Sequence, residues 1–471
     1  MIVPSQSVGT NGIADQGYNV VSSTSQPSLF RYSWRRVWSP SHGDQVGIQR
    51  SAWAISDQAV VSLASFLSTI LVGRFCSPDQ LGVYTLAVGG FWLINGFPNA
   101  LVWTPYTSRA PRMAGSRRAR YAGSVLSHLA AILTVVCGAL VLLAAGALAA
   151  GRALWIETAA SFEFAFLFLA LIPFVVMMTL REHVRRVHMA HLEMRELLRV
   201  DLPIAFTQVA LMGVLAYYQR LSAMAAILVI ALACSISAMS LIVRHGEIEF
   251  RSELARLHFA YNFGFGRWLV VASLAWLVSE NSYRWLMWRF HGLDSVGQMA
   301  AALYIVLLVN PLLVSICYFT RAVMANQLAE CGAAEINRTA LRATALMGLG
   351  FGGMFGALAV YGGDLVALLY GKDYAGQDLV VAMFCLAIFF RAVAVPVDAA
   401  LMALRRGKLL ATGAIVQLCF ALVTGGLLIH AFGAVGAGCA MATSDGISLA
   451  VRWVLFRRID GVSLRGYSDE H

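Results

Sequence analysis

Apolar residues occur in long runs along most of the chain, and polar residues are concentrated in the short intervals between these runs. A helix needs about 20 mostly apolar residues to cross the hydrocarbon core of a bilayer. By that measure the pattern predicts twelve membrane-spanning helices. They lie at about 52–73, 82–106, 121–149, 154–180, 201–219, 221–243, 267–288, 296–320, 340–361, 379–403, 408–430 and 433–456. The least distinct boundary is in 201–243, where only Gln219 and Arg220 separate two spans.

The composition supports a membrane protein. Hydrophobic residues make up 59% of the 471 residues and charged residues 13%, against about 25% charged residues in ordinary soluble chains. A soluble fold of this length could not bury so much apolar surface, whereas a bilayer accepts it on the outside of helices. The predicted fold class is therefore an all-α integral membrane protein.

The first fifty residues form a different kind of sequence, rich in Ser, Gln and Gly. Such a composition is typical of disordered segments. The predicted organisation begins with a disordered cytoplasmic tail (1–50) and a six-helix lobe (51–243). A cytoplasmic linker (244–266) leads to a second six-helix lobe (267–458) and a cytoplasmic tail (459–471). The longest internal stretches between spans, 181–200 and 244–266, are predicted to form amphipathic helices at the membrane interface.

Basic residues are distributed unequally between the two sides of the predicted membrane. Twelve spans put both termini on one side, and that side, together with the span ends that adjoin it, holds 28 of the 35 Lys and Arg residues. Five lie on the other side and two, Arg284 and Arg391, lie well inside spans. Because cytoplasmic loops carry the excess of Lys and Arg, both termini are predicted to be cytoplasmic. A miscounted span would reverse this bias partway along the chain, and no reversal occurs.

Several chemistries have no motif in this sequence. The chain has no Gly-x-x-x-x-Gly-Lys-Ser/Thr loop for ATP and no His-Glu-x-x-His zinc motif. The longest predicted external loop, about 362–378, is too short for a catalytic domain. Three histidines at 183, 188 and 191 have no nearby carboxylate set to complete a metal site. The basic residues alternate with apolar runs rather than forming the patch typical of nucleic-acid binding. The sequence therefore predicts neither an enzyme nor a cofactor, metal or nucleic-acid partner.

An internal repeat links the two halves of the chain. Arg74-Phe75, Asp79, Leu81-Gly82 and Asn95 are followed, at a constant offset of 215, by Arg289-Phe290, Asp294, Val296-Gly297 and Asn310. Six crossings separate the first and seventh spans, so the two halves run in the same direction. Parallel repeats related by an axis along the membrane normal are typical of transporters, with the substrate site between the halves. The repeat predicts two parallel six-helix lobes around a central cavity.

Three segments carry a resemblance to a known family. They are Leu71–Tyr84, Tyr370–Tyr374 and Phe432–Gly438. The stretch Leu71–Tyr84 resembles the first helical hairpin of Wzx-type polysaccharide flippases, which belong to the multidrug/oligosaccharidyl-lipid/polysaccharide exporter superfamily. Tyr370–Tyr374 is similar to the external Gly-x-x-Tyr segment of that family, and Phe432–Gly438 to its turn into the last span. The likeness covers most of residues 50–460, but the long N-terminal tail is not a feature of the family.

The resemblance implies a fold and a function. The family folds as two six-helix bundles around a V-shaped cavity, and its members move polyprenyl-pyrophosphate-linked oligosaccharides to the outer leaflet of the bacterial cytoplasmic membrane without ATP. The expected partners are then this lipid-linked substrate, membrane lipids, a coupling H⁺ or Na⁺, and polymerases or glycosyltransferases of surface polysaccharide synthesis.

Ionisable residues inside the bilayer are costly and therefore mark candidate sites. Those away from the ends of the predicted spans are Asp57, Glu163, Glu280, Arg284, Arg391, Asp398 and Asp445. Glu280 and Arg284 share a helical face and can pair. Arg391 lies roughly 18 Å along its span at 1.5 Å per residue, and the planar guanidinium fork suits a pyrophosphate. The predicted substrate-binding residues are Arg284, Glu280, Arg391, Asp398 and Asp57.

Other interpretations of the same residues stay open. The buried charges also fit structural ion pairs that join helices, with Arg391 paired to Asp398 or Asp445. An ion-coupled exporter of small molecules would share the architecture but would need fewer arginines in its cavity. A membrane polysaccharide polymerase or ligase would need a larger external loop than this chain has, and a scaffold that does not transport would tolerate loss of the buried charges.

Overall fold

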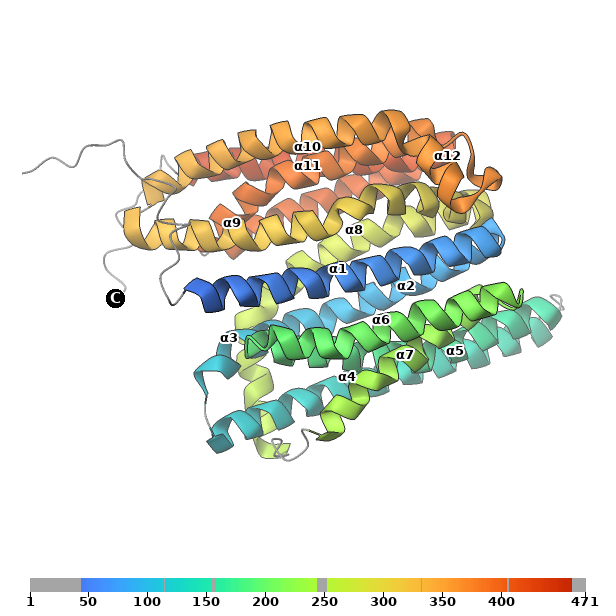
Figure 1. Cartoon of the computed structure of the whole chain (residues 1–471), viewed down its shortest axis with the longest axis horizontal. Helices are drawn as coiled ribbons and strands as arrows, with labels where there is room; N and C mark the ends of the chain where they lie inside the picture. The colour runs from blue at the N-terminus through green and yellow to red at the C-terminus, as the bar shows by residue number, and fades with distance from the viewer. Residues whose placement is uncertain are drawn as a thin grey trace, which may run out of the picture. The chain divides into compact units, whose positions relative to one another are not determined.

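Every regular element in the described part of the chain is helical in the computed structural model. The structure describes residues 44–113, 115–153, 158–243, 252–331, 333–404 and 406–459. The helices are α1 (Asp44–Phe75), α2 (Pro78–Pro98), α3 (Thr104–Arg109), α4 (Gly115–Ala153), α5 (Thr158–Ala190), α6 (Met194–Tyr217), α7 (Ala223–Val243), α8 (Ser252–Val306), α9 (Asn310–Cys331), α10 (Ala333–Tyr370), α11 (Asp378–Ala403) and α12 (Gly407–Ile459). Figure 1 shows most of them lying side by side along their lengths. Short turns join some of them: η2 (Asn99–Trp103, π-helical), η3 (Ala110–Arg112), η5 (Leu307–Val309) and η6 (Lys372–Tyr374).

Ten helical stretches in the described residues are long and apolar enough to cross a membrane. Two of them, Val270–Arg321 and Gly407–Arg458, are 52 residues long. At 1.5 Å per residue such a stretch is about 78 Å long, more than twice the roughly 30 Å of hydrocarbon. Both contain a glycine with non-helical backbone: Gly292 has φ 81° and ψ −178°, and Gly433 has φ 57° and ψ −129°. Residues other than glycine rarely adopt positive φ. These two glycines therefore mark places where the chain turns.

The predicted division between the fifth and sixth spans is confirmed. Helix α6 ends at Tyr217 and α7 begins at Ala223. The short connection between them includes Gln219 in a left-handed conformation, with φ 54°. A short polar break in the sequence is therefore enough to mark a real turn.

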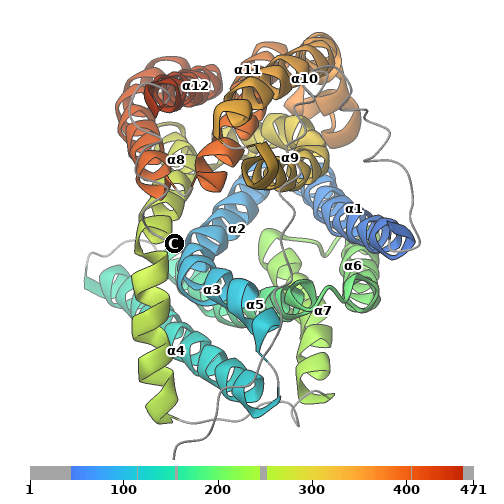
Figure 2. The same ribbon diagram turned by 90° about the vertical axis from the view of Figure 1, so that its left-hand side faces the viewer.

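Helix packing defines two groups and the contact between them. In the first half, α5 packs against α4 and α7, and α6 packs against α7. In the second half, α11 packs against α9, α10 and α12, while α8 packs against α12. Helix α2 lies along α8 and joins the two groups, as Figure 2 shows.

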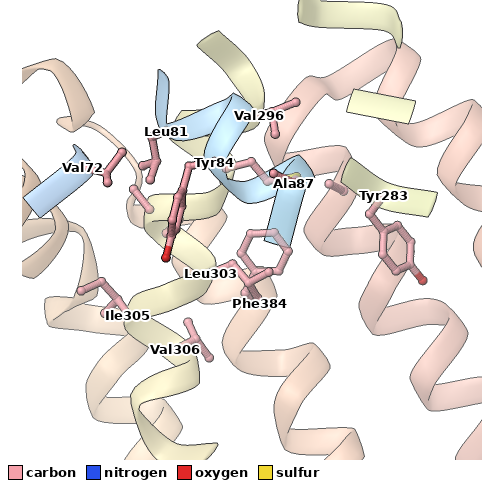
Figure 3. Packing of buried hydrophobic residues seen from close by; sticks show 14 of the residues in the cluster. Val72, Leu81, Tyr84, Ala87, Tyr283, Val296, Leu303, Ile305, Val306 and Phe384 are labelled. Carbon is pink, nitrogen blue, oxygen red and sulfur yellow. The ribbon is translucent and has the colours of Figure 1, made fainter. Parts of the chain in front are cut away.

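One apolar core is shared by both halves. Val72, Leu81, Tyr84 and Ala87 come from α1 and α2, and they belong to the same buried cluster as Val296, Leu303 and Phe384. Figure 3 shows these side chains converging around Tyr84. Tyr84 is 4% exposed and Leu81 is fully buried. Between helices in a bilayer, association is driven by close van der Waals packing rather than by transfer from water, and this cluster packs α1 and α2 against the second half.

The beginning of α8 contacts the first half directly. The Tyr121 hydroxyl donates to Asn262 Oδ1 at 3.2 Å, and His258 Nδ1 lies 2.9 Å from Ser124 Oγ. The ring centroids of Tyr121 and His258 are 5.0 Å apart in an edge-to-face arrangement. In Figure 2 this part of α8 extends past α4. Helix α8 is then continuous from Ser252 until the break at Gly292.

One predicted segment differs from the structure. The range 181–200 is predicted to lie at the membrane interface, but its first ten residues continue α5, and Arg181 and Arg185 are only 7% and 5% exposed. These two arginines pair with Asp201 within the bundle, and this allows the helix to continue. The range 244–266 is predicted to be helical, and its described residues from Ser252 onward lie in α8.

The remaining segment predictions lie partly outside the described residues. Residues 1–43 of the predicted N-terminal tail, 244–251 of the linker and 460–471 of the C-terminal tail are among them. The described residues of the predicted N-terminal tail, from Asp44 to Arg50, form the first turns of α1.

Candidate functional site

A cavity of about 480 Å³ lies among helices of the second half. Its walls come from α8, α9, α11 and α12, and they combine apolar side chains with an unusually polar set for a membrane helix bundle. The polar and aromatic lining consists of Ser273, Trp276, Asn310, Arg321, Arg391, Asp398, Gln417, Asp445, Ser448 and Arg452.

Arg391 joins three helices at one side of this cavity. Its two terminal nitrogens donate to the two carboxylate oxygens of Glu280, Nη1 at 3.1 Å and Nη2 at 2.6 Å. Nη2 also donates to Asp445 Oδ2 at 3.0 Å. Arg391 is on α11, Glu280 on α8 and Asp445 on α12. A bidentate guanidinium–carboxylate pair fixes direction as well as distance, so Arg391 sets the spacing of all three helices.

The network continues from Asp445 to the opposite side of the cavity. Gln417 Nε2 donates to Asp445 Oδ1, and Arg452 Nη2 donates weakly to Gln417 Oε1 at 3.5 Å. Arg452 Nη1 donates to Asp398 Oδ2 at 2.7 Å. Six side chains thus form one chain of contacts: Glu280, Arg391, Asp445, Gln417, Arg452 and Asp398.

The charges of the network are nearly balanced, but its hydrogen bonds are not complete. Three carboxylates face two arginines within it, and the cavity wall adds Arg321. Arg391 Nε, Arg452 Nε and Asp398 Oδ1 are buried without a hydrogen-bond partner in the part of the chain that the structure describes. A buried polar group without a partner costs about 1–3 kcal/mol. The network therefore keeps bonding capacity for a polar partner that enters the cavity.

The predicted site residues are distributed as follows. Arg391 and Asp398 both line the cavity, but they pair with Glu280 and Arg452 rather than with each other. The carboxylate of Glu280 is held by Arg391. Arg284 instead donates to the backbone oxygen of Glu280 at 3.2 Å and to Asn281 Oδ1 at 3.3 Å. The predicted pairing of Glu280 with Arg284 is therefore not the one in the structure.

Asp57 belongs to a separate cluster in the first half. Its Oδ2 accepts from Arg185 Nη2 at 3.0 Å, and Arg185 also pairs with Asp201. Arg181 Nε donates to Asp201 Oδ1 at 2.9 Å. Asp57 and Asp201 are 1% and 0% exposed. The cluster ties α1 to α5 and α6, and Asp57 is not among the residues that line the cavity. The side chain of Glu163 lies outside the described residues.

Arg452 and Gln417 are functional candidates that the sequence does not single out. The hydropathy pattern groups Arg452 with the basic residues at the end of the last span, yet its side chain is only 12% exposed. The sequence feature that could have identified Arg452 is its spacing from Asp445. The two residues are seven apart and so share a helical face. Gln417 offers no comparable signal in an otherwise apolar segment.

The ends of α1 and α10 hold the two halves together. Arg74 Nη1 donates to the backbone oxygens of Leu368 and Leu369 at 2.8 and 3.2 Å. Those carbonyls belong to the last turn of α10, where backbone oxygens have no partner within the helix. The hydroxyls of Thr69 and Tyr370 are 3.2 Å apart, and the ring of Tyr370 lies over Gly73. This contact set closes the bundle at the end where α1 and α10 finish.

Comparison with known proteins identifies the class of fold. No family model matches the sequence, and no curated protein matches it. Solved structures do match: the chain has the all-helical fold of multi-pass membrane transporters of the MOP superfamily. One such structure is the inward-facing conformation of a multidrug resistance MATE family transporter, with a TM-score of 0.67 and 14% identity, covering 87% of this chain and 98% of that one.

Two further structures show the range of proteins with this fold. The lipid II flippase MurJ in an inward closed conformation matches with a TM-score of 0.62 and 13% identity, covering 87% of both chains. A MOP superfamily transporter from Pyrococcus furiosus, described as having a binding pocket of reverse polarity, matches with a TM-score of 0.60 and 12% identity, covering 88% of this chain and 95% of that one. These neighbours are transporters and not enzymes, and at such identities they show the fold alone.

Proposed function

We propose that the protein is a transporter that moves a polyprenyl-pyrophosphate-linked oligosaccharide from the cytoplasmic to the outer leaflet of the bacterial cytoplasmic membrane. The observation that carries the proposal is the cavity with three arginines inside a bundle of this fold. One solved structure with the same fold is a lipid II flippase. The resemblance of Leu71–Tyr84 to Wzx-type flippases supports the same substrate class.

The proposed topology has twelve spans in two parallel six-helix lobes. The described residues contain ten apolar helical stretches, and the two 52-residue stretches each contain a glycine break that would divide them into two spans. With twelve spans, the distribution of Arg and Lys puts both termini in the cytoplasm. The cavity then lies within the second lobe, and alternating access requires the two lobes to move relative to each other.

The cavity chemistry fits an anionic headgroup with attached sugars. Arg391 and Arg452 each have an unsatisfied Nε in the described structure, and Arg321 lines the same cavity. A pyrophosphate oxygen can replace a carboxylate as the partner of a guanidinium fork. Ser273, Asn310 and Ser448 offer hydrogen bonds to sugar hydroxyls, and Trp276 offers a flat apolar face. The carboxylates displaced from Arg391 would then be free to bind a coupling H⁺ or Na⁺.

The membrane potential can drive such transport without ATP. Each negative charge that leaves a cell with a negative interior gains about 2.3 kcal/mol per 100 mV. A pyrophosphate with two charges therefore gains roughly 4–5 kcal/mol per 100 mV. In this mechanism the arginines neutralise the headgroup while it crosses the apolar centre, and the lipid tail stays in the bilayer.

Mass spectrometry of lipid extracts from cells with and without the gene tests the proposal. The expected result is accumulation of a polyprenyl-pyrophosphate oligosaccharide on deletion, together with less surface polysaccharide. Complementation with Arg391→Gln should fail at normal protein levels, whereas complementation with Arg199→Gln should succeed, because Arg199 is exposed and pairs with Glu196 on the same turn. An unchanged lipid pool and unchanged surface glycan in the deletion strain would reject the proposed substrate.

A second candidate function is export of small cationic molecules. The observation that favours it is the presence of three carboxylates in the network, together with the match to MATE family transporters. Deletion would then increase sensitivity to lipophilic cations and leave the lipid-linked pool unchanged. This outcome and the previous one are distinguished in the same pair of strains.

A further inference from the structure

Two equivalent spans of the internal repeat depart from α-helical geometry at corresponding places. In the first half, α2 ends at Pro98 and continues through the π-helical turn η2 into α3. In the second half, α8 ends at Val306 and continues through the 3₁₀ turn η5 into α9. The equivalent residues are Asn95, one turn before η2, and Asn310, directly after η5. In transporters built from repeats, interrupted helices at corresponding positions of the two halves mark the region of the substrate site.

A proline causes the turn in the second half. A regular α-helix would pair the backbone oxygen of Leu307 with the N–H of residue 311, but Pro311 has no N–H. The N–H of Asn310 donates to the oxygen of Leu307 instead, and this tightens the helix to 3₁₀ geometry. One residue of the sequence therefore specifies this interruption, and alanine at position 311 would permit regular pairing.

The turn in the first half is wider rather than tighter. Pro98 leaves the backbone oxygen of Ile94 without its usual donor in the helix. The N–H of Thr104 then donates to the oxygen of Asn99, five residues earlier, and the Thr104 hydroxyl donates to the same oxygen at 2.8 Å. A 3₁₀ stretch inside a helix often marks a hinge, and π-helical turns are frequent at functional sites.

The helices are packed closely on one side of the two turns. A Cβ at Gly89 of α2 would lie 2.5 Å from Asn281 Oδ1 on α8, and one at Gly96 would collide with Leu277. Glycines at such a crossing let two helix backbones approach closely. The part of α2 that precedes η2 is therefore held against α8, and this contact joins the two halves.

Beyond the turns, the two helices follow different halves. Helix α3 packs against α5 of the first half and also touches α8, whereas α9 packs against α10 and α11 of the second half. Figure 2 shows α3 beside α5, and Figure 1 shows α9 beside α10 and α11. The side chains of α9 that line the cavity, from Asn310 to Arg321, all follow η5. A rotation between the halves would thus be taken up at η2 and η5, where the backbone hydrogen bonding is already irregular.

We propose that η2 and η5 are a pair of hinges at which α3 and α9 bend when the cavity changes access from one side of the membrane to the other. The inference rests on the proposed alternating access but not on the proposed substrate. The cavity residues of α11, from Arg391 to Met402, lie in the second half of that helix, away from the end where Thr69 and Tyr370 close the bundle. Bending at the two turns changes the spacing of α3 and α9 and leaves the close contact of α2 with α8 in place.

The accessibility of Cys317, which lines the cavity, tests the hinges. The full-length protein retains Cys317 and has its other cysteines replaced by serine. Intact cells are treated with 2-sulfonatoethyl methanethiosulfonate, which does not cross the membrane, so label accumulates each time the cavity opens outward. Pro98→Ala and Pro311→Ala should each slow this labelling about fivefold, because each restores a backbone hydrogen bond that bending has to break. Labelling in permeabilised cells, where the reagent reaches both sides, should stay at the wild-type rate.

Pro173→Ala is the matched control, because Pro173 lies inside α5, which is α-helical from Thr158 to Ala190. This variant should be labelled at the wild-type rate. Wild-type rates in both hinge variants would overturn the proposal, and so would equal slowing by Pro173→Ala. A Cys317 that is labelled only after permeabilisation would also overturn it, since the cavity would then not change access. An unchanged lipid-linked pool in the deletion strain would reject the proposed substrate and leave this labelling pattern in place.

Discussion

Gly82 and Gly297 occupy the same position in the internal repeat, and they lie against each other where α2 crosses the second part of α8. A Cβ on Gly82 would collide with the backbone carbonyl of Leu293, and a Cβ on Gly297 with that of Pro78. Two equivalent positions that touch are expected beside the axis that the predicted repeat implies. The repeat therefore keeps both faces of this crossing free of side chains, and it allows the backbones of the two halves to meet.

Gly82→Ala should destabilise the protein. The added methyl has to push α2 and α8 apart, and overpacking of this kind costs typically about 1–3 kcal/mol. Gly90→Ala is the matched control, because Gly90 is on the same helix and has open space at the Cβ position. Alanine stabilises a helix interior by roughly 0.5–1 kcal/mol relative to glycine. Thermal unfolding in detergent should show a lower Tm for the first variant only. Equal Tm values for both would mean that the crossing is loosely packed.

The bridge from Arg391 to Glu280 should behave as a coupled unit. Removing one partner of a buried ion pair leaves the other uncompensated and costs about 3–5 kcal/mol. Arg391→Met and Glu280→Gln should each lower the Tm, and the double variant should be more stable than the sum of the two losses predicts. A double-mutant cycle of thermal unfolding measures this difference. Additive losses would show that the two side chains contribute independently.

Asp57→Asn and Asp398→Asn should affect different properties. Asp57 is buried with Arg185 outside the cavity, so its loss should lower stability and leave export by the surviving protein unchanged. Asp398 lines the cavity and its side chain is 28% exposed, so its loss should reduce export with a smaller change in Tm. Export per folded molecule and Tm measured on the same preparations separate the two effects. Impaired export by Asp57→Asn protein of normal stability would place Asp57 in the transport pathway.

Cys76 should report the side of the membrane on which α1 and α2 are joined. It lies between two apolar stretches, and burial raises the pKa of its thiol to about 11. The thiolate is the reactive form, so labelling should accelerate about tenfold per pH unit between about pH 7 and 9. The measurement is labelling of intact cells with a membrane-impermeant methanethiosulfonate reagent. The protein carries Cys331→Ser, because Cys331 also lies between candidate spans and could be labelled. The remaining described cysteines lie within candidate spans. Labelling of Cys76 only after permeabilisation would reverse the predicted topology.

Much of the fold could be predicted because the bilayer imposes one dominant requirement. An apolar run of about 20 residues is either a span or a large exposed apolar surface, so the helices follow from hydropathy. The breaks near Gly292 and Gly433 also fall where polar or glycine residues interrupt long runs. The candidate position of Arg391 follows in the same way, since a charge far from both ends of a span needs a partner or a polar cavity.

The partners of the buried charges could not be predicted from spacing along the chain. Glu280 and Arg284 are close on one helix, yet Glu280 bonds to Arg391, which is 111 residues away. The contact of Glu280 with Arg391 on another helix has better geometry than a contact with Arg284 on the same helix. It forms only because α8 packs against α11. Hydropathy places Arg185 just outside one span and Arg452 near the end of another, and the partners of both are missed for a related reason. A charge at a span end can extend outward or pair inward, and hydropathy does not distinguish the two.

Helix α8 couples the two halves mechanically as well as by packing. Its beginning is hydrogen-bonded to α4 through Asn262 and His258, and Glu280, on the same unbroken helix, holds Arg391. Eighteen residues separate Asn262 from Glu280, a length of about 27 Å at 1.5 Å per residue. An unbroken helix of that length can move as one rigid body, so a displacement at Asn262 also displaces Glu280. A small rotation of α4 at one end would be carried to the carboxylate that holds the cavity arginine, so the first half can influence the proposed binding site without contributing a side chain to it.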